Sequence, residues 1–286
     1  MNHSRLYRTE AIVLRRHDFG EADRILVLLT PGRGKVRAIA KGTRRLTSRT
    51  RGHLELFSHS NLQLARGRNL DVVTQAETLR PPRGVRDDLL RATYAYHLVE
   101  LVDRLAPEGQ PQRSLFALLA DALAVLDSDA DPALLARFFE VRALGLMGFR
   151  PQLESCLVCG DELGPEDNVY DPAMGGVVCP GCVLEGQGRL LAPEVFRVLR
   201  FLQGRPWTDV QNLRLRPATA RAVEEVLVAT LRHVLEREMR SVEFLANLRA
   251  VTGGRGKPPG PLPRRGPRPR APAPGSPATP RAPGSA

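Results

Sequence analysis

The chain has 286 residues, of which 42% are hydrophobic and 26% are charged, and its formal net charge is +11. This length suggests about two domains, and the hydrophobic content is enough for folded cores. No apolar run approaches the roughly 18 residues needed to span a bilayer, and the charged start MNHSRLYRTE lacks the apolar core of a signal peptide. We therefore expect a globular cytoplasmic protein without a membrane partner.

The positive charge is concentrated at the two ends of the chain. Residues 1–80 carry 16 Lys and Arg against 7 Asp and Glu, residues 81–252 carry 19 against 24, and residues 253–286 carry 7 against none. Two basic segments that flank a mildly acidic body predict contact with a polyanion. Only three of the 42 basic residues are Lys, so the arginine bias of a GC-rich genome would also explain part of this charge.

Residues 1–80 show the pattern of a small β-domain. β-Branched and leucine-rich runs cover residues 9–20, 23–30, 35–40, 53–65 and 70–77, and turn signals such as PGRG and RGRN separate them. Closing five such strands into a barrel removes the exposed sheet edges. We therefore predict an OB-fold nucleic-acid-binding domain at residues 1–80, and periodicity alone leaves an SH3-like barrel open.

A basic loop, AKGTRRLTSRTRG, lies between the third and fourth predicted strands and contains no acid. Guanidinium and ammonium groups on such a loop can follow a phosphate backbone with little sequence preference, whereas the few aromatic residues supply little base stacking. Lys35 and Arg37 alternate along one strand and are expected to point together and to extend the patch. A solvated loop with surplus charge is the alternative. The candidate DNA contacts are Arg33, Lys35, Arg37, Lys41, Arg44, Arg45, Arg49 and Arg51.

From residue 81 the hydrophobic period becomes helical. Helical runs cover residues 85–106, 114–127, 132–148, 192–204 and 217–238. The first run is expected to have an apolar face made of Leu89, Ala92, Tyr96, Val99 and Leu105. We predict a helical domain at residues 81–252. Residues 253–286 are rich in Pro, Gly and positive charge and predict a disordered basic tail, which either tethers nucleic acid or has no role of its own.

All four cysteines form two C-x-x-C pairs, Cys156 with Cys159 and Cys179 with Cys182. In a reducing compartment this spacing predicts a tetrahedral Zn²⁺ site, and Gly160 and Gly181 are expected to turn backbone amides toward the sulfurs. Four thiolates leave no open position, so one structural zinc ion is expected to hold a ribbon inserted at about residues 151–187. A thioredoxin-like dithiol and an iron–sulfur cluster are the alternatives.

The sequence contains no recognisable catalytic motif. A Walker-type glycine loop, G-x-S-x-G and H-E-x-x-H are all absent, so we expect no catalytic residues and no enzyme activity. Asp18, Glu21 and Asp23 could hold Mg²⁺, but such acids more often cap a turn and pair with a neighbouring arginine, here Arg16 or Arg24. His97 is expected to be a core or boundary residue.

Three segments resemble one bacterial family. EAIVLRRHDFGEADRILVLLTPGRGKVRAIAKGTRR, FEVRALGLMGFRPQLESCLVCG and LEREMRSVEFL are similar to RecO, and the resemblance runs from residue 5 to residue 250. It implies an α+β multidomain protein with an N-terminal five-stranded OB barrel, whose basic face includes Lys35, Arg37, Lys41, Arg44 and Arg45, and a mostly helical body.

The resemblance also implies a function and partners. It implies a nucleoid-associated recombination mediator that binds single- and double-stranded DNA, anneals strands and loads RecA onto DNA coated by single-strand-binding protein. The implied protein partners are RecR, RecF and the acidic C-terminal tail of the single-strand-binding protein. The alternative from a different class is a zinc-ribbon factor of transcription or translation that binds RNA.

Overall fold

The structure is a computed structural model, and it describes residues 5–128, 130–164 and 166–235. These residues belong to one compact unit that spans residues 1–248. The predicted tail at residues 253–286 and the end of the last predicted helix lie outside the described residues. Within the described residues, no helix is long and apolar enough to cross a membrane.

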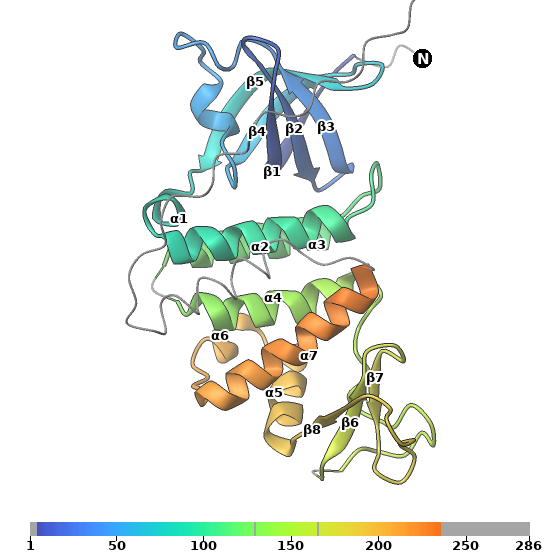
Figure 1. The fold of residues 1–286 in the computed structure, drawn as a ribbon. Helices are drawn as coiled ribbons and strands as arrows, with labels where there is room; N and C mark the ends of the chain where they lie inside the picture. Colours follow the sequence, from blue (N-terminus) through green and yellow to red (C-terminus); the bar gives the residue numbers. More distant parts are fainter. Residues whose placement is uncertain (1–4, 129, 165, 236–286) are drawn as a thin grey trace, which may run out of the picture. The chain divides into compact units, whose positions relative to one another are not determined.

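Five strands close into a barrel in the order β1-β2-β3-β5-β4 (Figure 1). Neighbouring strands are antiparallel except β3 and β5, which pair in parallel, so the predicted OB-like closure is confirmed. The strands are β1 (Leu6–Phe19), β2 (Asp23–Thr30), β3 (Gly34–Ala40), β4 (His59–Ala65) and β5 (Asp71–Arg80).

Strand β1 is buried on both of its faces, which explains its unbroken apolar run. Ala11 and Val13 point into the barrel core, whereas Ile12 and Leu14 belong to the core shared with the helices. Successive side chains of a strand point to opposite faces, so a continuous apolar run requires two packed partners. The barrel is therefore joined to the helical body by a hydrophobic contact.

The predicted strand at residues 53–65 was wrong in its first half. A 3-10 helix, η1 (Arg51–Leu54), comes first, and β4 begins only at His59. Phe57 between them has φ = 67°, and the Ser58 amide donates a 3.2 Å bond to the Glu55 carbonyl. This left-handed turn interrupts the extended backbone, and hydrophobic alternation alone does not reveal it.

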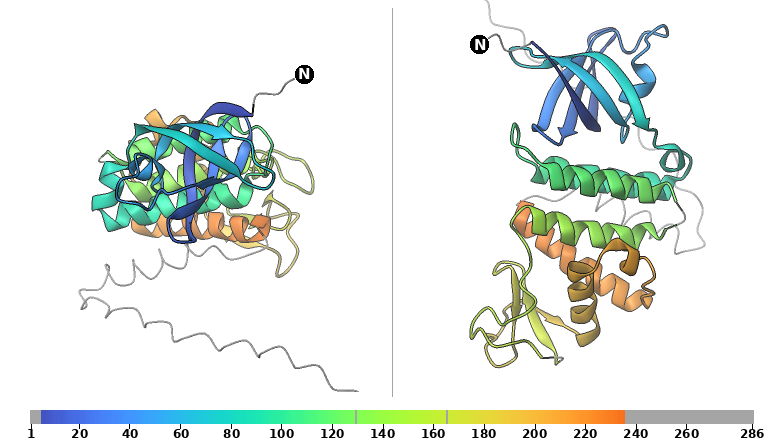
Figure 2. Two further views of the ribbon diagram at one scale, coloured as in Figure 1. Left: turned by 90° about the horizontal axis from the view of Figure 1, so that it is seen from above. Right: turned by 180° about the vertical axis from the view of Figure 1, so that it is seen from behind.

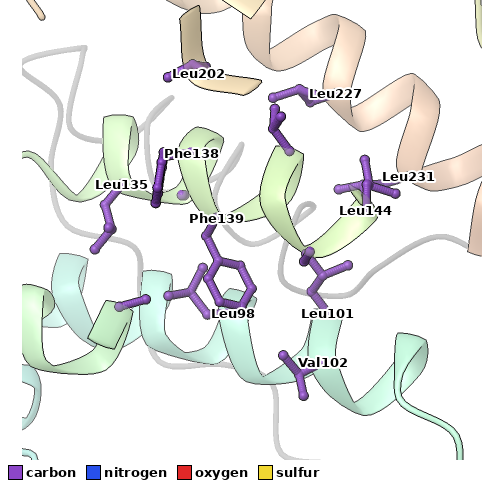
Figure 3. Close-up of a cluster of buried hydrophobic side chains, with 14 of the residues drawn as sticks. Leu98, Leu101, Val102, Leu135, Phe138, Phe139, Leu144, Leu202, Leu227 and Leu231 are labelled. Carbon is purple, nitrogen blue, oxygen red and sulfur yellow. The ribbon is translucent and has the colours of Figure 1, made fainter. Parts of the chain in front are cut away.

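The helical body packs around α4, which contacts α2 and α3 on one side and α5 and α7 on the other (Figures 1 and 2). Figure 3 shows the apolar side chains of α2, α4, α5 and α7 that meet at this helix. The helices are α1 (Arg83–Asp87), α2 (Leu89–Leu105), α3 (Arg113–Leu126), α4 (Pro132–Leu146), α5 (Pro193–Gly204), α6 (Trp207–Val210) and α7 (Pro217–Leu235).

The apolar face predicted for α2 was wrong at two positions. Leu89 and Tyr96 are 64% and 49% exposed, whereas Tyr94, Leu98 and Leu101 are almost completely buried. Helix α2 lies between the barrel and α4, so its buried surface is broader than one helical stripe. The apolar residues of α2 therefore do not mark a single face. Their spacing alone does not show which of these side chains are buried.

The cysteine segment, which follows α4 and precedes α5 in the chain, forms a small sheet with strand order β7-β6-β8 (Figure 1). Its strands are β6 (Asn168–Asp171), β7 (Gly176–Val178) and β8 (Arg189–Leu191), so β8 lies beyond the predicted limit at residue 187. The hydroxyls of Tyr170 and Thr230 are 2.8 Å apart and connect β6 to α7. The change from strands to helices falls between Arg80 and Arg83, as the sequence indicates, while the domain limits themselves stay predictions.

Candidate metal centre and nucleic-acid interface

The four cysteines converge at one point. Their Sγ atoms all lie within 4.8 Å of one another, and those of Cys159 and Cys179 are 3.9 Å apart. A tetrahedral Zn²⁺ with bonds of about 2.3 Å separates its sulfur ligands by roughly 3.8 Å. Two C-x-x-C turns nineteen residues apart thus provide four sulfur donors at a spacing that fits one tetrahedral metal ion.

Backbone geometry places the sulfurs. The amides of Val158 and Cys179 donate to Cys156 Sγ at 3.4 and 3.3 Å, as expected for sulfurs that carry negative charge. Gly160 has φ = 79° and its amide bonds to the Cys156 carbonyl at 3.0 Å, so the first turn requires a left-handed residue there. Gly181 is not among the residues with positive φ, so the second turn does not require a left-handed residue there.

The Cys156 thiol is the best prepared of the four to lose its proton. Burial raises its pKa, but hydrogen bonds from the backbone amides of Cys179, Cys159 and Val158 outweigh burial and lower the pKa to about 6. Metal ligands of this kind must be thiolates, so the local backbone favours the form that binds a metal.

The start of the basic loop is fixed to the β1–β2 turn. Arg44 donates its amide to the Ala22 carbonyl at 2.9 Å and its Nη1 to the Gly20 carbonyl at 3.2 Å, and its Nε is 3.4 Å from Asp18. The Gly42 amide donates to Asp23 at 2.7 Å. Part of the Arg44 side chain therefore holds the loop in place.

Two of the three acids considered as a Mg²⁺ site, Asp18 and Asp23, hold this turn together. Asp18 also pairs with Arg24 at 3.0 Å, and Arg16 pairs with Glu55. The hydrogen bond from Arg24 outweighs desolvation and, with the neighbouring arginines, lowers the pKa of Asp18. Arginines thus bind the Asp18 carboxylate, and an amide binds the Asp23 carboxylate. These contacts support the prediction that the acids stabilise a turn rather than bind a metal.

Several predicted DNA contacts are exposed and free of protein partners. Within the residues that the structure describes, their side chains have no ion pair or hydrogen bond. The side chain of Leu46 is 91% exposed in the same loop, so the loop projects into solvent. The free cations of this group are Arg37, Lys41, Arg45, Arg49 and Arg51.

Two predicted contacts are directed elsewhere. Lys35 Nζ donates to the Asp103 carbonyl of α2 at 2.6 Å and lies 3.5 Å from the Asp103 carboxylate, so it connects the barrel to the helical body. The guanidinium of Arg33 lies 4.3 Å from the centre of the Tyr7 ring. Lys35 and Arg37 therefore do not act as a pair, because Lys35 is bound to Asp103. The sequence alone does not show that Asp103 lies opposite Lys35.

Two features were not selected from the sequence. Arg66 and Arg68 in the β4–β5 loop are exposed, and Arg66 lies 6.0 Å from the Tyr7 ring that Arg33 also covers. Phe19 is 53% exposed at the β1–β2 turn to which Arg44 is bonded. The basic composition of the loop RGRN could have indicated Arg66 and Arg68. The turn motif HDFGEAD could have indicated that Phe19 lies at a turn.

Comparison with known proteins gives a consistent result. Residues 1–82 match the family described as Recombination protein O N terminal, and residues 86–243 match Recombination protein O C terminal. A protein of Roseiflexus sp. (strain RS-1) named DNA repair protein RecO is 44% identical over 250 residues, which are 86% of this chain and 87% of the relative. Proteins of the same name from Symbiobacterium thermophilum and Nocardioides sp. are 39% and 42% identical, over 86% and 84% of this chain and 99% of each relative.

Proposed function

The chain belongs to the RecO family, whose members act in DNA repair and recombination, and we propose that it is a recombination mediator without enzymatic activity. It binds single- and double-stranded DNA at the nucleoid, anneals complementary strands and helps load RecA onto DNA coated by single-strand-binding protein. The group of free cations on the barrel, from Arg37 to Arg51, is the observation that supports DNA binding.

Annealing needs no covalent step. Two strands repel each other through their phosphates, and a protein that neutralises phosphates lowers this repulsion without reading bases. Exposed arginines and a lysine on one loop can contact several phosphates because their side chains have no partner among the described residues, while Asp18 and Asp23 hold the start of the loop. Because these side chains contact phosphates rather than bases, they can bind DNA of any base sequence.

The test replaces Lys41, Arg45 and Arg49 by alanine together. These three side chains have no partner among the described residues, so their loss should leave the fold intact, whereas Arg44 also fixes the loop. Each phosphate contact contributes about 0.7 to the salt slope on single strands, so the slope should fall by up to about two units at any sequence. Fluorescence anisotropy against salt concentration measures binding, and a two-oligonucleotide assay measures annealing.

The matched control removes three exposed arginines from the helical body, Arg113, Arg197 and Arg221. It has the same net charge as the triple variant and should keep the parental slope. If the control loses more affinity than the loop variant, the DNA-binding surface lies on the helices. Annealing by the parent also separates this proposal from an RNA-binding transcription or translation factor, which needs no annealing activity.

For the metal centre we propose one structural Zn²⁺, bound by Cys156, Cys159, Cys179 and Cys182. When bound, zinc supplies a tetrahedral crosslink and no catalytic water, because four thiolates fill its positions. The short strands β6 to β8 then have a fixed point in addition to their contact with α7 through Tyr170.

For the acidic tail of the single-strand-binding protein we propose a pocket between α3 and α4. Leu118, Val141 and Leu146 line it, its volume is about 450 Å³, and Arg142 and Arg150 lie at its side. Burial and the charge of Arg150 lower the pKa of Arg142, whose buried Nε has no partner among the described residues. An apolar side chain next to carboxylates would fill the pocket and neutralise both arginines.

A labelled synthetic peptide of that tail tests this assignment. Arg142→Gln and Arg150→Gln together should weaken peptide binding at least about tenfold, because charge-assisted hydrogen bonds are lost. Arg197→Gln and Arg221→Gln together are the control and should have no effect. Equal binding by both double variants would place the tail elsewhere. We also propose RecR and RecF as partners, on the basis of family membership alone.

A further inference from the structure

A second pocket of about 450 Å³ lies where the barrel meets the helices, and none of its lining residues belongs to the basic loop, the metal centre or the α3–α4 pocket. Residues of β4, β5, the segment after β5 and α3 contribute to it. Its walls are largely apolar and include Phe57, Leu79, Pro81, Pro82, Leu123 and Ala124.

One residue that lines the pocket, His59, has a hydrogen-bond acceptor that the described part of the fold does not use. Its Nε2 is 2.8 Å from the Glu10 carboxylate. In the neutral imidazole, Nε2–H donates to Glu10 and Nδ1 is an acceptor. His59 Nδ1 is buried and has no hydrogen-bond partner among the described residues. A buried acceptor without a donor is unfavourable, so an N–H or O–H group brought into the pocket would be stabilised there.

The backbone at this pocket is strained. Phe57 is the non-glycine residue with positive φ in the described part of the chain, and a bulky side chain rarely adopts that conformation. Its ring meets Tyr96 edge to face at 4.9 Å, and Tyr96 and Leu79 remain 49% and 43% exposed. Exposed apolar side chains next to an apolar pocket are typical of a protein-binding surface.

The charge around the pocket is positive. Arg80 and Arg83 line it, are exposed, and have no side-chain partner within the described residues. Asp127 also lines the pocket and accepts the Val85 amide at 3.1 Å, so the lining has two positive charges and one negative charge. A ligand with negative charge beside its apolar part would complement this arrangement.

We propose that this pocket receives a Trp or Tyr side chain of a partner protein, with an acidic residue next to it. These side chains combine an apolar ring with a single N–H or O–H donor, as the walls and His59 Nδ1 require, and they commonly dominate binding at interfaces. The adjacent carboxylate would contact Arg80 or Arg83. This surface is separate from DNA binding and does not depend on it.

The first test uses indole and 1-methylindole as probes in NMR titrations of the full chain. Indole should shift the amide signals of His59, Leu79 and Leu123, and 1-methylindole, which lacks the donor, should bind about fivefold more weakly. His59→Phe keeps a ring against Phe116 but removes Nδ1, so it should make the two probes bind equally. Equal affinity of both probes for the parent, or shifts confined to other regions, would overturn the proposal.

The second test uses the peptide acetyl-Asp-Trp-Asp-amide and a matched pair of α3 variants. Ala124 lines the pocket and is half-buried, whereas Ala117 is exposed and does not line it. Ala124→Phe should fill the pocket and weaken the peptide at least about tenfold, and Ala117→Phe should not. Arg80→Glu with Arg83→Glu should weaken the peptide but not indole. DNA binding should be unchanged by Ala124→Phe, and peptide binding that survives this variant contradicts the proposed pocket.

Discussion

Phe19 is the one large aromatic side chain that the β1–β2 turn presents beside the basic loop. It is 53% exposed, and the bond from Arg44 Nη1 to the Gly20 carbonyl keeps a cation next to it. A base stacked on a ring gains about 1–3 kcal/mol, and only an unpaired base is free to stack. Phe19→Ala should therefore weaken single-stranded DNA binding at least fivefold and change duplex binding little.

Anisotropy with a single strand and its duplex measures this difference. Phe149→Ala is the control, because Phe149 is 48% exposed but lies after α4, outside the barrel. An equal loss on both DNA forms would mean that Phe19 supports the loop rather than a base.

A buried charge network holds α2 and α4 together. Glu140 is fully buried and lies 2.5 Å from His97 Nε2 and 2.7 Å from Arg137 Nη2. Arg137 also reaches Glu224 of α7 at 3.6 Å. Arg137→Met should destabilise the fold by about 3 kcal/mol, because it removes one of the charges that compensate a buried carboxylate.

Urea unfolding measures this loss, with exposed Arg197→Met as the control. The double variant Arg137→Met, Glu140→Gln should recover part of the stability because the uncompensated charge is gone. If the double variant is less stable than the single one, Glu140 is stabilised by its other contacts and Arg137 matters for packing alone.

With zinc bound as proposed, the sheet of β6, β7 and β8 is the element that depends most on a ligand. Its three strands are short, and their buried side chains, such as Tyr170, Val177 and Leu191, pack into the core of the helical body rather than into a core of their own. We therefore expect metal binding to contribute to the folding free energy of this sheet. Cys156→Ser should release one zinc ion per chain, and a loss of about 2 kcal/mol would lower the melting temperature by roughly 4–8 °C. Val158→Ser, on the exposed part of the same turn, should keep the metal. DNA binding by the barrel should persist in both variants.

Zinc content by mass spectrometry of the metal and calorimetric melting check this prediction. A Cys156→Ser protein that retains one zinc ion and the parental melting temperature would exclude the four-cysteine site.

The strength of each sequence signal explains which elements could be predicted. The four cysteines and the barrel strands follow local rules, namely C-x-x-C spacing and alternation. The structure brings the cysteines together and closes the strands into a barrel as expected. The face of α2, the left-handed turn at Phe57 and the use of Lys35 depend on elements distant in sequence. Lys35 is predicted to contact DNA, and nothing in residues 1–80 indicates its contact with Asp103.

At the scale of the whole molecule, basic charge occurs on the barrel loop and in residues 253–286, which carry seven Lys and Arg and no acid. The tail lies outside the described residues, so its role rests on composition. If all seven charges contact phosphate, deleting the tail should reduce the salt slope on single strands by up to about five units. A tail of the same length with Lys and Arg replaced by Ser separates charge from chain length.

Combining the tail deletion with Lys41→Ala, Arg45→Ala and Arg49→Ala shows whether the two basic regions act on the same DNA. Independent contacts should add in free energy, whereas regions that compete for the same phosphates should show a smaller combined loss. Annealing should also respond to the tail, since bringing two strands together benefits from two separate cationic regions. We expect the tail deletion to slow annealing as well as to weaken single-strand binding, and both losses should be largest at low salt. If the tail deletion changes neither the salt slope of DNA binding nor the annealing rate, the barrel loop binds the DNA without the tail.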